Sequence, residues 1–472
     1  METICAISTP AGGALAVVRV SGENAIAYTA NIFKAKGKIS LQDKATSTLT
    51  FGNITDPESG EVIDEVLVSL FRSPHSYTGE DSTEISCHGS AYILNRIIQL
   101  LLAQGCRMAR PGEYTERAFL NGKMDLSQAE AVADLIASTT AANHRMAMQQ
   151  MKGGFSNELR QLRDQLLHIT SLMELELDFS DHEELEFASR PELLSLAEKI
   201  ASRLTSLCQS FRLGNALKKG IPVAIVGETN AGKSTLLNAL VGEERALVSN
   251  IHGTTRDTIE ETINVSGTLV RFIDTAGIRT TTDVVEKMGI DRTFEKLAEA
   301  EIVLWLIDIC HYQEQFDELS SKLLECSNGK QLFVILNKTD LADNVTTERA
   351  HTYISSHLPS HSSAIQVLNI SAQNATDIPL LRSKLSEGLS LLQQQTQTNG
   401  TETIVSNLRH YEALSAALSC IKQVINGLNQ HLSGDFISQD LRECIYHLSD
   451  IIGEVTTDQV LGNIFKNFCV GK

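Results

Sequence analysis

Short hydrophobic runs interrupted by prolines characterise the first part of the chain. Apolar positions cluster in runs such as "ALAVVRVSG" and "EVLVSLF", and Pro10, Pro57, Pro74 and Pro111 are four of the eight prolines in the sequence. Short runs rich in β-branched residues and bounded by turn formers predict strands. We therefore expect a mixed α/β domain over residues 1–121.

Hydrophobic positions recur at helical spacing in two later segments, residues 122–217 and 379–472. The first stripe contains Leu159, Leu162, Leu166, Ile169 and Met173, and the second contains Leu408, Tyr411, Leu414, Leu418, Ile421, Ile425 and Leu428. Intervals of three and four residues place such side chains on one face of a helix. Both segments are predicted to be helical, and the acidic stretch "MELELDFSDHEELEF" within the first is expected to be a solvated face or a loop.

The segment between them, residues 218–378, alternates short apolar runs with helical stretches. The runs are "IPVAIVG", "TLVRFIDTAG", "EIVLWLID", "QLFVILN" and "AIQVLNI". Continuous apolar runs of this length are typical of strands buried on both faces, as in a mainly parallel sheet with crossover helices. The simplest architecture is one discontinuous helical domain with an α/β domain inserted into it. The sequence shows no internal repeat.

The composition of the chain limits its expected cellular location and its expected binding partners. The chain has 472 residues, a net charge of −18 and 42% hydrophobic residues. It has no apolar run of the ~20 residues that a membrane span needs, and its start resembles neither a signal nor a transit peptide, so we expect a cytoplasmic protein without a membrane partner. The negative charge argues against binding of nucleic acid through the overall field of the protein, because phosphate contacts need clustered Lys and Arg. The nine cysteines contain no CxxC pair and no cysteine–histidine spacing typical of zinc, so they are interpreted as reduced thiols.

"GETNAGKS" (227–234) matches the pattern GxxxxGK[ST] between an apolar run and a helical stretch. In such a loop, backbone N–H groups surround the phosphates and Gly232 permits close approach. Lys233 is expected to reach the terminal phosphates, and the Ser234 hydroxyl is expected to bind Mg²⁺. The sequence therefore predicts a nucleotide-binding loop.

Further motifs follow in the order that a GTPase requires. "GTTRD" (253–257) offers a threonine hydroxyl to Mg²⁺, and Asp274 of "DTAG" is placed to organise the water shell of the metal. "NKTD" (337–340) predicts guanine recognition, since the carboxylate of Asp340 accepts from two donors that adenine does not present together. Ser371 and Ala372 would complete the base pocket. A set of ordinary turns between strands is the alternative, and GTP is the nucleotide that the combination favours.

GTP hydrolysis by these motifs needs a group other than the usual glutamine to orient the water. A Ras-like enzyme places a water-orienting Gln directly after the DTAG glycine, whereas Ile278 occupies that position here. Arg279 as a finger and Glu286 as a water-polarising group are candidates, and each is also compatible with a solvated loop.

"ARPGEYTERAFLNGKMDLSQAEAVADLI" (109–136), the GTPase motifs and the terminal "FCVGK" together resemble the MnmE (TrmE) family of tRNA modification GTPases, essentially from end to end. The resemblance implies an α+β folate-binding domain that dimerises, a discontinuous helical domain and an inserted G domain. It also implies a heterotetramer with the FAD protein MnmG, which adds an aminomethyl or carboxymethylaminomethyl group to C5 of the wobble uridine of certain tRNAs. The one-carbon unit would come from a 5-formyl- or 5,10-methylene-tetrahydrofolate.

The family pattern also implies site residues. The positions that match its folate contacts are Arg19, Glu84, Lys123 and Lys472, and Cys469 would lie beside the reacting carbon. Whether Cys469 is a nucleophile or polar packing stays open. From the tail alone, a frayed end or a weak prenylation signal are the alternatives.

For hydrolysis, the resemblance implies that K⁺ replaces an arginine finger and that Glu286 aligns the water, with Lys233 at the phosphates. The K⁺ ligands would be Asn230, Ser249, Ile251 and Thr254, and the Mg²⁺ ligands Ser234 and Thr255. The full set of expected GTP contacts is Asn230, Ala231, Gly232, Lys233, Ser234, Thr235, Ser249, Asn250, Ile251, His252, Gly253, Thr254, Thr255, Asp274, Thr275, Ala276, Gly277, Asn337, Lys338, Thr339, Asp340, Ser371 and Ala372.

Two other functions compete with this interpretation. A regulatory GTPase of ribosome or RNA assembly would share the G domain but would need neither a folate pocket nor Cys469. A cation-transport GTPase would need a membrane span, which the sequence lacks.

Overall fold

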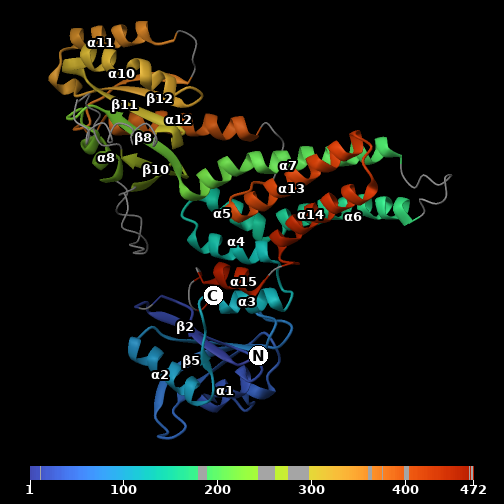
Figure 1. Ribbon diagram of the computed structural model, residues 1–472. Helices are drawn as coiled ribbons and strands as arrows, with labels where there is room; N and C mark the ends of the chain where they lie inside the picture. The colour runs from blue at the N-terminus through green and yellow to red at the C-terminus, as the bar shows by residue number, and fades with distance from the viewer. Residues whose placement is uncertain are drawn as a thin grey trace, which may run out of the picture. The chain divides into compact units, whose positions relative to one another are not determined.

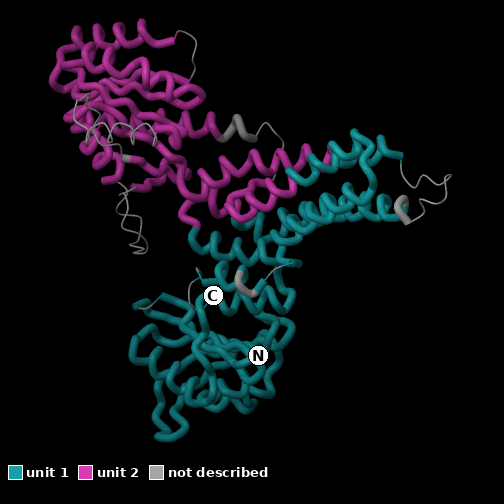
Figure 2. Tube along the Cα trace, viewed as in Figure 1, with its two compact units in different colours: residues 1–137, 147–197, 419–472 teal, residues 138–146, 198–418 magenta. Residues whose placement is uncertain are grey.

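The computed structural model describes residues 1–10, 12–178, 189–242, 261–274, 297–359, 364–374, 376–397, 403–455, 457–466, 468 and 471. The chain forms two compact units (Figure 2). Unit 1 contains residues 1–137, 147–197 and 419–472, and unit 2 contains residues 138–146 and 198–418. Three of the four unit boundaries fall within helices, namely α5 (Ala141–Met151), α7 (Arg190–Lys219) and α13 (Leu408–Asn429), and the fourth follows the last residue of α4 (Leu126–Ala137).

Unit 1 begins with a seven-stranded mixed sheet of order β3-β4-β5-β6-β2-β1-β7. All neighbours pair antiparallel except β1 and β7. Alternate side chains of β2 and β6, such as Val18, Val20 and Ile85, are fully buried in one core with the apolar face of α2. The elements are β1 (Ile4–Ile7), β2 (Leu15–Ser21), α1 (Ala25–Ile32), β3 (Phe33–Ala35), η1 (Leu41–Asp43), β4 (Thr48–Thr55), β5 (Val62–Phe71), β6 (Ser82–His88), α2 (Ala91–Ala103), β7 (Arg107–Met108) and α3 (Glu113–Leu120).

Helices make up the rest of unit 1. They are α4 (Leu126–Ala137), α6 (Gly154–Asp178), α14 (Gly434–Ile452) and α15 (Asp458–Phe465), with parts of α5, α7 and α13. The stripe predicted from Leu159 to Met173 is confirmed, because all five of its side chains on α6 are buried. α6 lies alongside α14 (Figure 1). Burial of each such leucine or isoleucine contributes about 1.5–3 kcal/mol, so the stripe accounts for the helix pairing.

The second stripe is confirmed only in part. Leu414, Ile421 and Leu428 of α13 are buried, but Leu408 is 55% exposed. Leu408 is the first residue of α13 and lies at the exposed start of the helix. Ala417 and Val424 are buried instead and complete the apolar face at spacings of three and four.

Unit 2 contains a six-stranded sheet of order β13-β12-β11-β8-β10-β9, and all five predicted runs form strands in it. Every pair is parallel except β9 with β10, which confirms the mainly parallel sheet. The elements are β8 (Ile221–Gly227), α8 (Lys233–Gly242), β9 (Glu261–Val265), β10 (Thr268–Asp274), β11 (Ile302–Asp308), η2 (Ile309–His311), α10 (Tyr312–Cys326), β12 (Gln331–Asn337), η3 (Thr339–Leu341), α11 (Asn344–His357), β13 (Ile365–Asn369) and α12 (Ile378–Gln397).

Helices cover both faces of this sheet. Val223 and Ile225 of β8 belong to one core with residues of α8 and α12, whereas Ala224 and Val226 belong to another with residues of α10 and α11. In Figure 1, α10 and α11 lie together over the sheet. Burial on both faces explains why the strands are continuous apolar runs. None of the helices within the described ranges combines the length and the apolarity needed to cross a membrane.

Candidate functional site

The phosphate loop (227–234) joins the carboxyl end of β8 to the start of α8. Gly227 has φ 157° and a Cβ there would overlap the carbonyl oxygen of Leu306, while Gly232 has φ 97° and a Cβ there would overlap the side-chain amide of Asn337. Between them, Asn230 has a φ of 69°. The loop therefore depends on glycine at both positions, and it leads into the N-terminus of a helix, where N–H groups and the helix dipole favour anions.

Lys233 places a cation inside this loop. Its ammonium group donates to the carbonyl oxygens of Gly227 and Glu228, each at 2.8 Å. The side chains of Ser234 and Thr235 are exposed in the first turn of α8. A half-buried cation at a helix N-terminus is suited to a phosphate chain, and the exposed hydroxyl of Ser234 is accessible to a metal ion.

Asn337 connects three loops at the carboxyl edge of the sheet. It is 1% exposed, its side-chain N–H donates to the carbonyl oxygen of Ala231 at 2.7 Å, and its side-chain oxygen accepts from the backbone N–H of Ala372 at 2.9 Å. Asn337 thus acts as a clamp between the phosphate loop and the loop at Ser371. Ser371 is held in turn by its backbone N–H, which donates to the carboxylate of Asp377 at 2.8 Å.

Lys338 and Asp308 form an ion pair that sequence reasoning missed. Lys338 has a left-handed backbone with φ 65°, and its ammonium group lies 2.6 Å from the Asp308 carboxylate. Burial opposes ionisation of Asp308, but the hydrogen bond and charge of Lys338 and the N–H of Cys310 hold the pKa of Asp308 below its ordinary value. The run "EIVLWLID" ends in Asp308 as "QLFVILN" ends in Asn337, and the two residues are register partners. Carboxyl ends of parallel strands meet at one edge, so this signal was available.

Gln315 ties the same edge to the phosphate loop. Its side-chain oxygen accepts from the backbone N–H of Asp308 at 2.8 Å, and its side-chain N–H donates to the Glu228 carboxylate at 3.1 Å. Thr339 and Asp340 follow in η3, where the side chain of Asp340 is exposed. The phosphate loop, Lys338 and Asp340 thus all follow the carboxyl ends of strands at one edge of the sheet.

The remaining nucleotide-site predictions lie outside the described residues. Asp274 ends β10 in register with Ile225 of β8, so its backbone is at the same edge of the sheet. The residues outside the description are Ser249, Asn250, Ile251, His252, Gly253, Thr254, Thr255, Thr275, Ala276, Gly277, Ile278, Arg279 and Glu286.

In unit 1 the structure brings together two of the predicted folate residues. Arg19 on β2 and Glu84 on β6 are register partners, and the guanidinium Nε donates to the Glu84 carboxylate at 2.9 Å. The guanidinium carbon lies 5.4 Å from the ring centroid of Tyr77 and 5.6 Å from that of Tyr114. Two aromatic rings and a carboxylate thus orient Arg19, and each cation–π contact contributes roughly 0.5–2 kcal/mol.

Lys123 and the C-terminal tail are each held by a hydrogen bond within unit 1. The Lys123 ammonium group donates to the carbonyl oxygen of Pro74 at 2.9 Å, in the segment that also carries Tyr77. Gly471 is buried against β1, where its carbonyl oxygen accepts from the Ser8 hydroxyl at 3.2 Å. Cys469 and Lys472, on either side of this anchor, lie outside the described residues.

A buried ion-pair network in α3 supports this cluster, and sequence reasoning did not single it out. Arg117 and Glu113 are 3% and 2% exposed, and Arg117 pairs with Glu113 at 3.0 Å and with Glu80 at 2.9 Å. Burial opposes ionisation of Glu113, but donors from Arg107, the Arg110 N–H and Arg117 lower its pKa to about 2. Tyr114, between these two residues, donates its hydroxyl to the Arg19 carbonyl oxygen at 2.8 Å. The signal for this network was the charge-rich stretch "RPGEYTER".

Comparisons with known proteins agree with this arrangement. Residues 126–469 match the family model described as the MnmE helical domain, and residues 3–123 match the model of the GTP-binding protein TrmE N-terminus. The chain is 56% identical to the tRNA modification GTPase MnmE of Bacteroides thetaiotaomicron, over 100% of this chain and 99% of that one. The corresponding proteins of Phocaeicola vulgatus and Flavobacterium johnsoniae are 53% and 49% identical, again over 100% of this chain and 99% of each relative. The chain therefore belongs to the MnmE family of tRNA modification GTPases.

Proposed function

We propose that this chain uses GTP hydrolysis to drive the addition of an aminomethyl or carboxymethylaminomethyl group to C5 of the wobble uridine of certain tRNAs. The observation that carries the proposal is the co-occurrence, in one chain matching its relatives over their full length, of the phosphate loop with its Asn337 clamp and of the Arg19–Glu84 cluster. A regulatory GTPase would need only the first of these two sites.

The proposal assigns a role to each segment of the chain. Residues 1–121 bind folate and dimerise, residues 218–378 bind and hydrolyse GTP, and residues 122–217 and 379–472 form the helical domain. The burial of Gly471 against β1 supports a role for the CVGK tail at the N-terminal domain rather than as a frayed end.

The geometry of unit 2 supports the proposed GTP binding. The backbone of residues 227–234 and the Lys233 ammonium group bind the phosphates, while Asp340 accepts from the guanine ring. Through its hydrogen bonds with Ala231 and Ala372, Asn337 links the phosphate loop to the loop at Ser371. Mg²⁺, which Ser234 and Thr255 would hold, supplies charge neutralisation at the phosphates.

Hydrolysis needs charge stabilisation and an oriented water, since Ile278 offers no hydrogen bond. K⁺ would be held by Asn230, Ser249, Ile251 and Thr254 and would supply the positive charge that an arginine finger supplies elsewhere. Glu286 is proposed to orient the water. The left-handed backbone of Asn230 supports its proposed role as a K⁺ ligand, because this conformation turns its side chain in a different direction from those of its neighbours in the loop.

The N-terminal cluster suits a tetrahydrofolate, either the 5-formyl or the 5,10-methylene form. The pterin presents donors that match the Glu84 carboxylate, and the glutamate tail presents carboxylates that match Arg19, Lys123 and Lys472. The contact with Arg19 orients the Glu84 carboxylate as an acceptor. Cys469, two residues before the buried Gly471 in the sequence, is proposed to act near the one-carbon unit.

The modification also needs partners in this proposal. An FAD-dependent MnmG-type protein joins a homodimer of this chain in a heterotetramer, and tRNA binds to that assembly in the cytoplasm. The net charge of −18 favours a partner that supplies the positive surface for tRNA.

Wobble-nucleoside analysis tests the proposal. Cells lacking the chain should lose the modified uridine and regain it with the unmodified gene. Lys233→Ala should fail to restore it, and so should truncation after Phe468, although the truncated protein should bind GTP normally. Unchanged nucleosides in the deletion strain would refute the modification role and favour the regulatory GTPase.

A further inference from the structure

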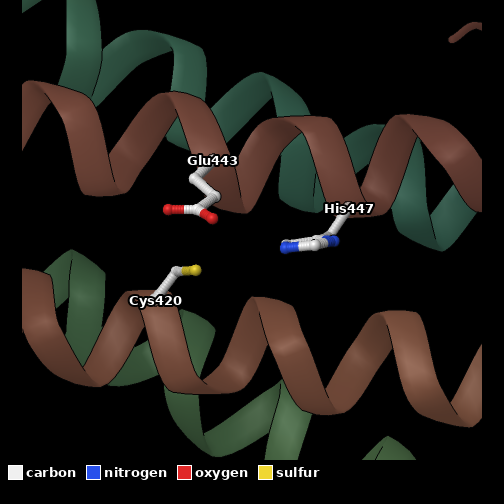
Figure 3. A group of neighbouring side chains, drawn as sticks. All are labelled: Cys420, Glu443 and His447. Atoms are coloured by element: carbon white, nitrogen blue, oxygen red, sulfur yellow. The ribbon is translucent and has the colours of Figure 1, made fainter.

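Three side chains of different chemistry converge between α13 and α14, far from both sites described above in sequence. Cys420 extends from α13, and Glu443 and His447 extend from α14 (Figure 3). The thiol sulfur, a carboxylate oxygen and a ring nitrogen all lie within 4.8 Å of one another. Figure 3 shows the three side chains directed toward one another across the space between the helices.

The fold of the helical hairpin determines this convergence. Glu443 and His447 are separated by four residues on α14, so they project from the same face of the helix. Ile437, Leu441 and Leu448 of the same helix are buried. Gly427 of α13 lies close to Ile437, since a Cβ there would be 3.1 Å from the Ile437 side chain. This approach brings the buried Cys420 opposite the Glu443–His447 face.

The polar groups of the cluster have unused bonding capacity. Within the part of the chain that the structure describes, Glu443 and His447 form neither a hydrogen bond nor an ion pair. Cys420 is 7% exposed. The proximity of these groups does not by itself stabilise the hairpin, because burial of a thiol beside an unpaired carboxylate contributes no favourable free energy.

The electrostatic environment favours a cation. The charges of Glu443 and Asp440 both act on the Cys420 thiol, and Asp440 lies one turn before Glu443 on α14. Two carboxylates therefore direct a negative field at the thiol, and a divalent cation would turn this repulsion into attraction.

The ligand types indicate which cation. Sulfur and imidazole nitrogen with one carboxylate suit Zn²⁺ and related transition metals, whereas Mg²⁺ and Ca²⁺ prefer oxygen alone. Ligand atoms in a tetrahedral zinc site lie about 3.5 Å apart, given metal–ligand distances of about 2.0–2.3 Å. Atoms already within 4.8 Å of one another reach that spacing by small side-chain rotations.

We propose that Cys420, Glu443 and His447 bind a divalent transition-metal ion of the zinc class, with Asp440 hydrogen-bonded to the water that fills the fourth position. The Cys420 S–H proton leaves to solvent when the sulfur–metal bond forms, and no electron is transferred. The bound ion joins α13 to α14 across the hairpin and so stabilises the second half of the helical domain. Cys420 lies on a different helix from Glu443 and His447, which explains why no zinc motif is visible in the sequence.

Metal titration of the full-length protein tests this site. The protein, loaded with Mg²⁺ and GDP, is titrated with Zn²⁺ against a chromophoric chelator, and with Co²⁺ to record its absorption spectrum. We expect one tightly bound Zn²⁺ per chain and a sulfur-to-cobalt charge-transfer band. Cys420→Ser should remove the band, and His447→Gln and Glu443→Gln should each weaken Zn²⁺ binding more than about 100-fold. Asp440→Asn should weaken it about 10- to 100-fold, as expected for a group that acts through a bound ligand.

Matched controls separate this site from other thiols and imidazoles. Cys310→Ser removes an exposed thiol of unit 2, and His168→Gln removes an exposed imidazole of α6, so neither should change the titration. Circular dichroism and GTP affinity verify that each variant is folded. If Cys420→Ser binds Zn²⁺ as tightly as the unmodified protein, or if the cobalt complex lacks the charge-transfer band, the proposal is wrong.

Discussion

The phosphate loop and the N-terminal cluster handle charge in opposite ways. The loop is built from backbone, with glycine at positions 227 and 232 where a side chain would overlap Leu306 or Asn337. The cluster is built from side chains, in which Arg117, Glu113 and Glu80 form a buried network beneath the Arg19–Glu84 pair. A backbone site loses function but not stability when one side chain is removed, whereas a buried network loses stability first.

The largest effect is expected from Glu113→Ala. The change leaves the Arg117 guanidinium, which is 3% exposed, without one of its two carboxylates, and breaking a buried pair typically costs about 3–5 kcal/mol. Urea unfolding should show this loss while GTP affinity stays unchanged. Glu116→Ala, which breaks an ion pair with the exposed Arg110, should cost at most about 1 kcal/mol. Equal losses for the two variants would remove the distinction between the regions.

Lys233→Ala should give the complementary result. Removing the cation from the phosphate loop should lower kcat by about 100- to 1000-fold, by analogy with loss of one transition-state donor. The free energy of unfolding should change little, because the two carbonyl oxygens that accept from the ammonium group, those of Gly227 and Glu228, belong to its own loop. Lys384→Ala on α12 is the control. A large loss of stability in Lys233→Ala would show that the loop is held by its side chain.

Acid should destabilise the N-terminal cluster through Glu113. The pKa of Glu113 is lowered to about 2 in the fold, against about 4.3 in an unfolded chain. Its contribution to stability is therefore fully present above about pH 4.3 and is lost as the pH falls toward about 2. Unfolding followed across this range should be less pH-dependent in Glu113→Gln than in the unmodified protein. Identical pH profiles would place the acid-sensitive group elsewhere.

The smallest effect is a change of specificity at the base. Asp340→Asn should weaken GTP by roughly 1.5–3 kcal/mol and improve binding of xanthosine triphosphate, because the amide donates where xanthine presents an oxygen. Asp343→Asn, which keeps the cap on the Thr346 N–H of α11, should leave both affinities unchanged. Equal binding of ATP and GTP by the unmodified protein would refute guanine recognition.

Local patterns in the sequence predicted the buried parallel strands of unit 2 and the phosphate loop, but not the edge strand β9. The five apolar runs between residues 218 and 378 all form strands, since burial on both faces of a parallel sheet leaves few polar positions. The phosphate loop was visible because its geometry requires glycine at a fixed spacing. The second helical stripe was predicted to begin at Leu408, but Leu408 is exposed at the start of its helix.

Only the tertiary structure decided which distant side chains meet. Arg19 and Glu84 pair because β2 and β6 are in register, Asp308 reaches Lys338 because β11 and β12 end together, and Gly471 is buried against β1 from the far end of the chain. Likewise, Cys420 faces Glu443 and His447 only through the hairpin of α13 and α14. Local sequence determines backbone conformation through sterics and hydrophobic periodicity, whereas contacts between distant side chains depend on strand register and helix rotation, which the whole core sets.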